Sequence, residues 1–242
     1  MKPLLPRPRL SLLAPVLAAV LGLGAATAQA PAPELVVVEH FTSQGCSSCP
    51  PADRLMSRLA GEPGILVLSR PVTYWDSLGW KDTLARPENS ALQRAYEGRL
   101  EGRAGVYTPQ AVVDGVWGGV GSGEAALRQA IAQARPASAK VQLARLDGSR
   151  LRATIEAPVA SEVVLVGYRR DVEVSVGRGE NRGRTLRYAN VVVGEKILGR
   201  TGAPSARFEA SLEPLQAKGA EAFAVLVETQ RAGRILGAGT LD

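Results

Sequence analysis

The only two cysteines of this 242-residue chain, Cys46 and Cys49, lie between two segments of contrasting character. Before them, Leu35–Thr42 is a nearly continuous apolar run, which is typical of a strand buried on both faces. After them, Pro51–Ala60 is predicted to form a helix with a proline in its first turn, where a missing N–H costs little. A strand that delivers a Cys-x-x-Cys to a helix N-terminus is typical of thiol–disulfide redox sites, because the unpaired N–H groups and the helix dipole favour a thiolate there.

The first half of the chain alternates between strand and helix patterns. Strands are predicted at Leu35–Thr42, Ile65–Ser69, Gln110–Val113 and Val116–Val120, and helices at Pro51–Ala60, Pro87–Leu100 and Gly123–Ala134. The order β-α-β-α-β-β-α, with Cys-x-x-Cys at the first β-to-α junction, is that of the thioredoxin fold. Thioredoxin-like proteins place a cis-proline before the third strand, so the Thr108–Pro109 bond is predicted to be cis. An ordinary trans proline at a strand start is the alternative.

Beyond a linker at 136–139, the pattern changes to short alternating strands with no convincing helix between them. Such strands, separated by turn residues such as Asp147-Gly148, predict a small antiparallel sandwich. The predicted fold class is therefore an α/β thioredoxin-like domain at 31–138, followed by a small all-β, sandwich-like antiparallel domain at 139–242. The seven predicted strands are Lys140–Leu146, Arg150–Ala157, Glu162–Tyr168, Arg187–Val193, Arg207–Leu212, Ala222–Glu228 and Arg234–Gly237.

Residues 1–30 have the features of a signal peptide. Lys2, Arg7 and Arg9 form a positive segment, 10–26 is mostly apolar, and Ala28-Gln29-Ala30 is a small-x-small cleavage signal. We expect cleavage after Ala30 and a mature chain that is secreted or periplasmic, without stable membrane insertion.

The charge balance and the cysteine count exclude several classes of protein. The chain has 29 Lys+Arg against 23 Asp+Glu, and three of the basic residues lie in 1–30, so the mature chain carries 26 − 23 = +3. This charge is too small to predict nucleic-acid binding. Two cysteines also exclude a protein whose fold depends on several disulfides. The pair is therefore either a structural disulfide between nearby residues or a reactive site.

Four blocks of sequence resemble a family of secreted bacterial proteins catalogued only as domain of unknown function number twelve-twenty-three. The resemblance implies a thioredoxin-like first half and a β-rich second half, and it implies no activity. The family usually has Leu at the position of His40, and His and Asp at those of Pro71 and Thr73, so the single histidine of this chain lies on a different predicted strand from the family's. The blocks are Val38–Asp53, Tyr74–Asp82, Val106–Gln110, and Arg178–Asn181 with Asn190–Val192.

The predicted catalytic residues are Cys46, Cys49, His40 and Glu39. Cys46 is expected to be the more exposed, attacking cysteine, and Cys49 the resolving one. Thioredoxins keep a buried acidic residue six positions before the first cysteine, where this chain has His40. Because side chains alternate along a strand, only His40 or Glu39 can lie beneath the disulfide as proton acceptor for Cys49. A histidine satisfied within the core is the alternative.

The predicted substrate-binding residues form two groups. Thr108 and Pro109 are expected to form the opposite wall of the site, where the Thr108 backbone could pair with an extended substrate. Tyr74, Trp75 and Trp80 are expected to line a substrate groove, or else to cap the core. The Arg178–Asn181 block is expected to dock the second half onto the first, with a basic hairpin loop as the alternative.

The sequence thus favours an exported thiol–disulfide oxidoreductase that needs no bound cofactor. Its partners would be protein thiols or disulfides, or small thiols, together with a partner that recycles the pair. One alternative is a copper or zinc carrier that uses Cys46, Cys49 and His40, although a closed zinc site would also need Glu39 or Asp53. A protein-interaction module whose disulfide does not turn over is the other alternative.

Overall fold

Twelve strands and four helices make up the part of the chain that the computed structural model describes, which is residues 1, 34–103, 105–202 and 205–241. Apart from Met1, the predicted signal peptide lies outside these residues. Residues Ala32–Asp242 form one compact unit. Among the described residues, no helix is long and apolar enough to span a bilayer.

The first half builds its elements around prolines and tight turns. Pro50 and Pro51 open α1, and Pro87 opens α2, as expected where N–H groups have no partner. Asp114 and Gly115 both have positive φ in the turn between β4 and β5, as a tight turn between antiparallel strands requires. The elements are β1 (Val36–Thr42), α1 (Pro50–Leu59), β2 (Ile65–Pro71), α2 (Pro87–Tyr96), β3 (Glu101–Gly102), β4 (Gln110–Val113), β5 (Trp117–Val120) and α3 (Glu124–Ala132).

The second half is almost entirely β, and two of its strands are unusually long. The strands β8 and β9 have 14 and 16 residues and form an antiparallel hairpin. The elements are β6 (Lys140–Arg145), β7 (Arg150–Glu156), β8 (Glu162–Ser175), β9 (Thr185–Arg200), β10 (Ser205–Ser211), α4 (Glu213–Gln216), β11 (Ala222–Glu228) and β12 (Ile235–Leu241).

The two halves share one sheet, and the predicted fold class is therefore wrong. Nine strands pair in the order β12-β11-β8-β9-β2-β1-β4-β5-β3, and only β10, β7 and β6 form a separate sheet. The two halves join where β9 lies parallel to β2, with Ser69 opposite Val191. The chain is thus not an α/β thioredoxin-like domain followed by a small all-β domain. It is a mostly β protein with a large mixed sheet and a three-stranded sheet.

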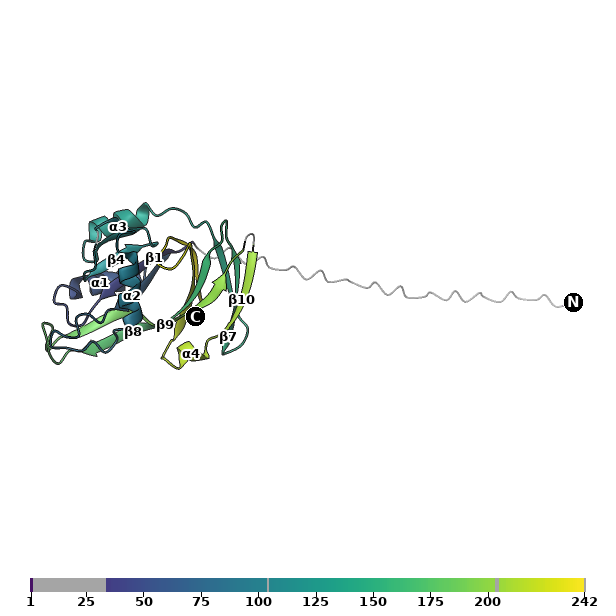
Figure 1. The fold of residues 1–242 in the computed structure, drawn as a ribbon. Coiled ribbons are helices and arrows are strands. Elements are labelled where there is room, and N and C mark those ends of the chain that lie inside the picture. The colour runs from purple at the N-terminus through teal and green to yellow at the C-terminus, as the bar shows by residue number, and fades with distance from the viewer. Residues whose placement is uncertain (2–33, 104, 203–204, 242) are drawn as a thin grey trace. The chain divides into compact units, whose positions relative to one another are not determined.

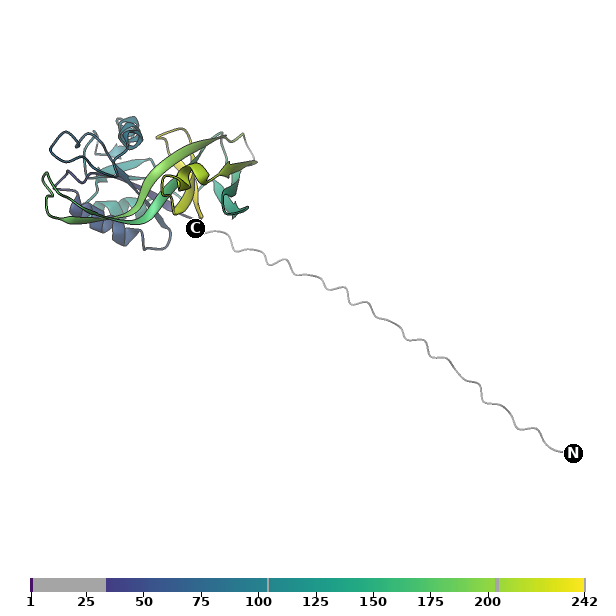
Figure 2. The same cartoon turned by 90° about the horizontal axis from the view of Figure 1, so that it is seen from below.

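The length of the β8–β9 hairpin is the physical reason for this difference. The sequence predicted strands that stop at Tyr168 and begin at Arg187, because the polar run Arg169–Asp171 resembles a strand end. Instead, β8 continues through these residues in register with β9, with Asp171 opposite Ala189. Figures 1 and 2 show this hairpin reaching past β2 to the region of α1.

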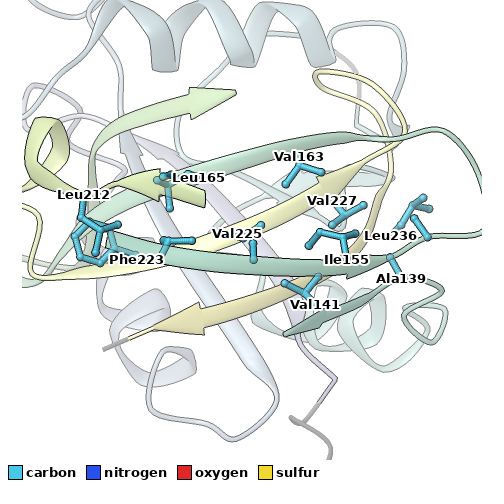
Figure 3. Close-up of a cluster of buried hydrophobic side chains, with 14 of the residues drawn as sticks. Ala139, Val141, Ile155, Val163, Leu165, Leu212, Phe223, Val225, Val227 and Leu236 are labelled. Carbon is cyan, nitrogen blue, oxygen red and sulfur yellow. The ribbon is translucent and has the colours of Figure 1, made fainter. Parts of the chain in front are cut away.

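Several apolar clusters fill the layers around the sheets. The largest lies between the three-stranded sheet and β8, β11 and β12, where Val141 and Ile155 face Val225 and Val227 (Figure 3). A second cluster packs α1 and α3 against one face of β1, which presents Val38. A third packs α2 against the other face of β1. These two faces of β1 separate the polar groups of the candidate site.

Candidate functional site

Cys46 and Cys49 form a disulfide at the start of α1, with their Cα atoms 5.4 Å apart. Cys49 is the residue before the helix, and its carbonyl accepts the Asp53 N–H at 3.0 Å. Both cysteines are completely buried, at 0% exposure, whereas Ser47 and Ser48 between them are exposed. The structure therefore does not bear out the expectation that Cys46 is the more exposed cysteine.

His40 lies on the face of β1 that α1 covers. Its Nε2 is 2.9 Å from Asp53 Oδ1, and the Thr42 hydroxyl donates to the same oxygen at 2.7 Å. These side chains are buried, and His40 Nδ1 and Asp53 Oδ2 have no hydrogen-bond partner among the described residues. A Cβ at Gly121 would lie 3.2 Å from His40 Nδ1, so the glycine leaves room for the ring. A buried and incompletely paired His40–Asp53 couple therefore lies between β1 and α1, the helix that follows Cys49.

Glu39 points to the opposite face of β1, as strand alternation requires. It accepts a hydrogen bond from Tyr96 of α2, and its Oε1 is 2.6 Å from Arg70 Nε. Arg70 also pairs with Glu195 at 2.7 Å. Of the two predicted proton acceptors, only His40 is therefore coupled to the cysteine helix.

The acids and bases around Glu39 form a buried cluster, which we call the α2-side network: Glu39, Arg70, Glu195, Arg231 and Glu228. Arg231 pairs with both Glu195 and Glu228. The network has three carboxyl groups but two guanidinium groups, and burial raises the pKa of Glu228 to about 8. Burial opposes ionisation of Glu195 as well, but Arg70 and Arg231 keep its pKa below the ordinary value. A proton on Glu228 thus balances the charge of the network at neutral pH.

Two side chains from the tip of the β8–β9 hairpin hold the cysteine loop closed. Asn181 Nδ2 donates to the carbonyl oxygens of Gln44 and Cys46, at 2.9 and 2.8 Å, and Asn181 is completely buried. Glu180 Oε2 accepts the Ser47 N–H at 2.9 Å, and the Ser47 side chain, together with this backbone N–H, lowers the pKa of Glu180. We call Glu180 and Asn181 the latch. They are the Glu-Asn of the Arg178–Asn181 block, which docks onto the first half as predicted.

A loop after β2 supports the cysteine loop from another side. Asp82 Oδ2 accepts the Gln44 N–H at 2.7 Å, and Trp80 Nε1 donates to Gln44 Oε1 at 2.8 Å. Burial raises the pKa of Asp82 to about 6. Trp80 also packs against the hairpin tip, where a Cβ at Gly179 would lie 3.1 Å from Trp80 Cβ. The hairpin tip therefore already covers part of Trp80.

The remaining predicted substrate-binding residues lie near β4 and the cysteine loop. The Thr108–Pro109 bond is cis, as predicted. Burial raises the pKa of Tyr74. Trp75 lies against the cysteine loop, 3.4 Å from where a Cβ on Gly45 would be. Trp75 and Trp80 thus border the cysteine loop, whereas the role of Thr108, Pro109 and Tyr74 in binding a substrate stays a prediction.

Comparison with protein families identifies the chain. Residues 37–228 match the family model described as Protein of unknown function (DUF1223). The chain belongs to the DUF1223 family. The crystal structure of protein AGR_C_4864 from Agrobacterium tumefaciens is similar to this DUF1223 chain, with a TM-score of 0.73 and 29% identity over 86% of this chain and 94% of that one.

A second solved structure resembles this DUF1223 protein in fold alone. HBP35 of Porphyromonas gingivalis has a TM-score of 0.57 and 16% identity, over 86% of this chain and 75% of that one. No curated protein matches the sequence.

The DUF1223 site includes residues that sequence reasoning did not place there. Asp53 was considered only as a fourth metal ligand. Its position four residues after Cys49, on the apolar face of α1, was the available signal. The latch was expected to dock, but nothing in the sequence indicated that it contacts the cysteine loop. Among the residues that the structure describes, no three His, Cys, Asp or Glu side chains come together as a potential metal site.

Proposed function

We propose that this protein is an exported thiol–disulfide oxidoreductase that uses Cys46 and Cys49 as its redox pair. One observation carries the proposal: the Cys46–Cys49 disulfide opens α1, and a buried His40–Asp53 couple lies behind that helix. Thiols at helix N-termini are stabilised as thiolates by the helix dipole, and the thiolate is the reacting species in disulfide exchange.

The chemistry follows from the two thiols. In the reduced protein, the Cys46 thiolate attacks one sulfur of a substrate disulfide, which forms a mixed disulfide and releases one substrate thiolate. Cys49 then loses its proton and attacks Cys46 Sγ, which releases the second substrate thiolate and restores the Cys46–Cys49 disulfide. The substrate gains two electrons and the protein loses two. The same steps in reverse would oxidise a substrate dithiol.

His40 is our candidate for the group that accepts the Cys49 proton. Its Nε2 lies 2.9 Å from Asp53 Oδ1, and a carboxylate at this distance would stabilise the imidazolium that forms. Glu39 does not take this role, because its carboxylate is paired with Arg70 on the opposite face of β1. The proposed catalytic residues are therefore Cys46, Cys49 and His40, with Asp53 as the partner of His40. Glu39, which was predicted from the sequence, takes no part in the proposed reaction.

Exchange requires the cysteine loop to open, because both sulfur-bearing residues are buried. Release of the latch would free the carbonyl oxygen of Cys46 and the N–H of Ser47, and would expose the edge of the loop. Thr108, Pro109, Tyr74 and Trp75 would then line the approach of a substrate. We place the protein outside the cytoplasm, acting on protein or small-molecule thiols, with a separate partner that recycles the pair.

The burial of both cysteines also favours a second candidate, which is a protein-interaction module whose disulfide does not turn over. A disulfide that substrates cannot reach stabilises a loop and has no catalytic role.

A redox titration separates the two candidates. The mature protein is equilibrated in glutathione buffers, and free thiols are trapped with a maleimide that shifts the mass. We expect a reversible two-electron transition between about −120 and −270 mV, the range of known exchange catalysts. We also expect Cys49→Ser to accumulate covalent partners through Cys46. A pair that stays oxidised below about −300 mV, with no trapped partner, would support the interaction module instead.

A further inference from the structure

A pocket of about 500 Å³ opens between α2 and the β8–β9 hairpin, on the side of β1 away from α1. Its volume falls within the range of about 300–1,000 Å³ that is typical of small-molecule sites. No residue of the Cys-x-x-Cys segment lines it. Its walls combine the basic residues Arg86, Lys218 and Arg231 with the apolar residues Leu92, Val164 and Ile197.

The basic wall contains a lysine that is available to a ligand. Lys218 follows α4 and is exposed, and among the described residues no carboxylate lies within ion-pair distance of its ammonium group. Its side chain lies over Gly194, where an added Cβ would be 3.6 Å from Lys218 Nζ. Arg86, at the start of α2, also lines the pocket, but its guanidinium pairs at 3.3 Å with Glu88, a second lining residue, so this pair adds no net charge.

The acid at the base of the pocket is already neutralised. Glu195 accepts from Arg70 at 2.7 Å and pairs with Arg231, and these two arginines keep its pKa low. Glu195 therefore does not compete for Lys218 and does not give the pocket a net negative potential. Burial of paired charges beneath a cavity leaves the unpaired ammonium group as the dominant charge at its mouth.

The apolar wall includes one side chain that is largely exposed to solvent. Ile197 is 55% exposed, although Leu92 and Val164 beside it in the wall are 4% and 1% exposed. An exposed isoleucine near a lysine without a carboxylate partner is a combination that suits a ligand with an apolar body and one anionic group.

We propose that this pocket binds a small amphiphilic anion, with its carboxylate or sulfonate on Lys218 and its apolar body on Ile197 and Leu92. This site is independent of the proposed redox function and uses a different face of the molecule.

Anilinonaphthalene sulfonate tests the proposal as a fluorescent anionic probe of the folded mature protein. We expect saturable binding of one probe per chain. Lys218→Met should weaken it about tenfold, the loss expected for one charge-assisted hydrogen bond. Lys140→Met is the matched control, because Lys140 is an exposed lysine of β6 that does not line the pocket. It should leave the affinity unchanged. Ile197→Asn should weaken the probe and its uncharged analogue, phenylnaphthylamine, alike.

Competition identifies the source of the anion. Decanoate should displace the probe, whereas vesicles of phosphatidylglycerol should not. The proposal is overturned if binding does not saturate below about 1 mM. Equal losses for Lys218→Met and Lys140→Met would also overturn it, because they would indicate general surface charge. Displacement by vesicles alone would overturn the assignment to a small soluble ligand.

Discussion

Glu39 and His40 are neighbours on β1, but they enter two different kinds of buried polar cluster. On the α1 face, His40 meets one carboxylate, and two of the polar atoms in this pair have no partner among the described residues. On the α2 face, Glu39 belongs to a network of five ionisable groups that joins both halves of the chain, and polar atoms of Glu39, Arg70 and Glu228 also make no hydrogen bond among the described residues. The first cluster contains no guanidinium group and lies against the helix that follows Cys49, whereas the second is held by two guanidinium groups and loses stability if a member is removed. Burial of a polar group therefore does not by itself indicate function, and the position of His40 beside α1 is what distinguishes it from Glu39.

The largest expected effect is on the α2 face. Arg70→Met leaves Glu39 and Glu195 buried without a shared cation, and should lower the free energy of unfolding by about 3–5 kcal/mol. Denaturant titration measures this loss. The control is Arg152→Met, whose partner Glu209 is exposed, and it should cost less than about 1 kcal/mol. Similar small losses for both variants would mean that the α2-side network does not hold the fold together.

A second prediction tests the charge balance of the same network. The pKa of Glu228 is raised to about 8 from 4.5, so the folded state binds more protons than the unfolded state between these values. The free energy of unfolding should therefore fall as pH rises through this window, by roughly 3 kcal/mol between pH 5 and pH 8. Glu228→Gln should remove this part of the pH dependence. Parallel stability curves for the wild type and this variant would contradict the assignment of the proton to Glu228.

The third prediction concerns the α1 face and depends on the proposed redox function. Asp53→Asn removes the charge that would stabilise a His40 imidazolium, and should slow thiol–disulfide exchange about 100-fold and shift its pH profile. Glu39→Gln makes the same chemical change on the other face of β1. It should leave the exchange rate within about twofold of the wild type, although it lowers stability. Equal slowing of exchange by the two variants would contradict the proposal that only the α1 face of β1 takes part in the reaction.

The smallest expected effect comes from the latch. Asn181→Ala removes two hydrogen bonds to the cysteine loop, each worth about 1 kcal/mol, and should speed reduction of the disulfide by dithiothreitol about tenfold. Mass-shift trapping over time measures this rate. Arg182→Ala changes an exposed residue of the same hairpin tip and should leave the rate unchanged. An unchanged rate in Asn181→Ala would show that the latch does not control access.

The sequence was informative where structure depends on nearby residues. The disulfide at the start of α1, the Asp114–Gly115 turn and the cis bond at Pro109 each follow from a short motif. The alternation of Glu39 and His40 also followed from strand geometry.

Sequence reasoning failed where long-range pairing decides the structure. Nothing near Ser69 indicates that Val191 will lie beside it, yet this pairing joins the two halves and overturns the predicted fold class. The polar residues Arg169–Asp171 lie inside β8, so the sequence pattern predicted a strand that was too short. The latch contacts Cys46 across 135 residues of sequence, and no local pattern records such a contact.

That separation has a consequence for how the molecule is made. A chain synthesised from its N-terminus presents Cys46 and Cys49 to its surroundings long before Asn181 exists. Throughout that interval, the thiols are open to any oxidant or partner thiol they meet. The loop can become enclosed only after the β8–β9 hairpin is synthesised, so during synthesis the cysteines react without the restriction that the latch later imposes.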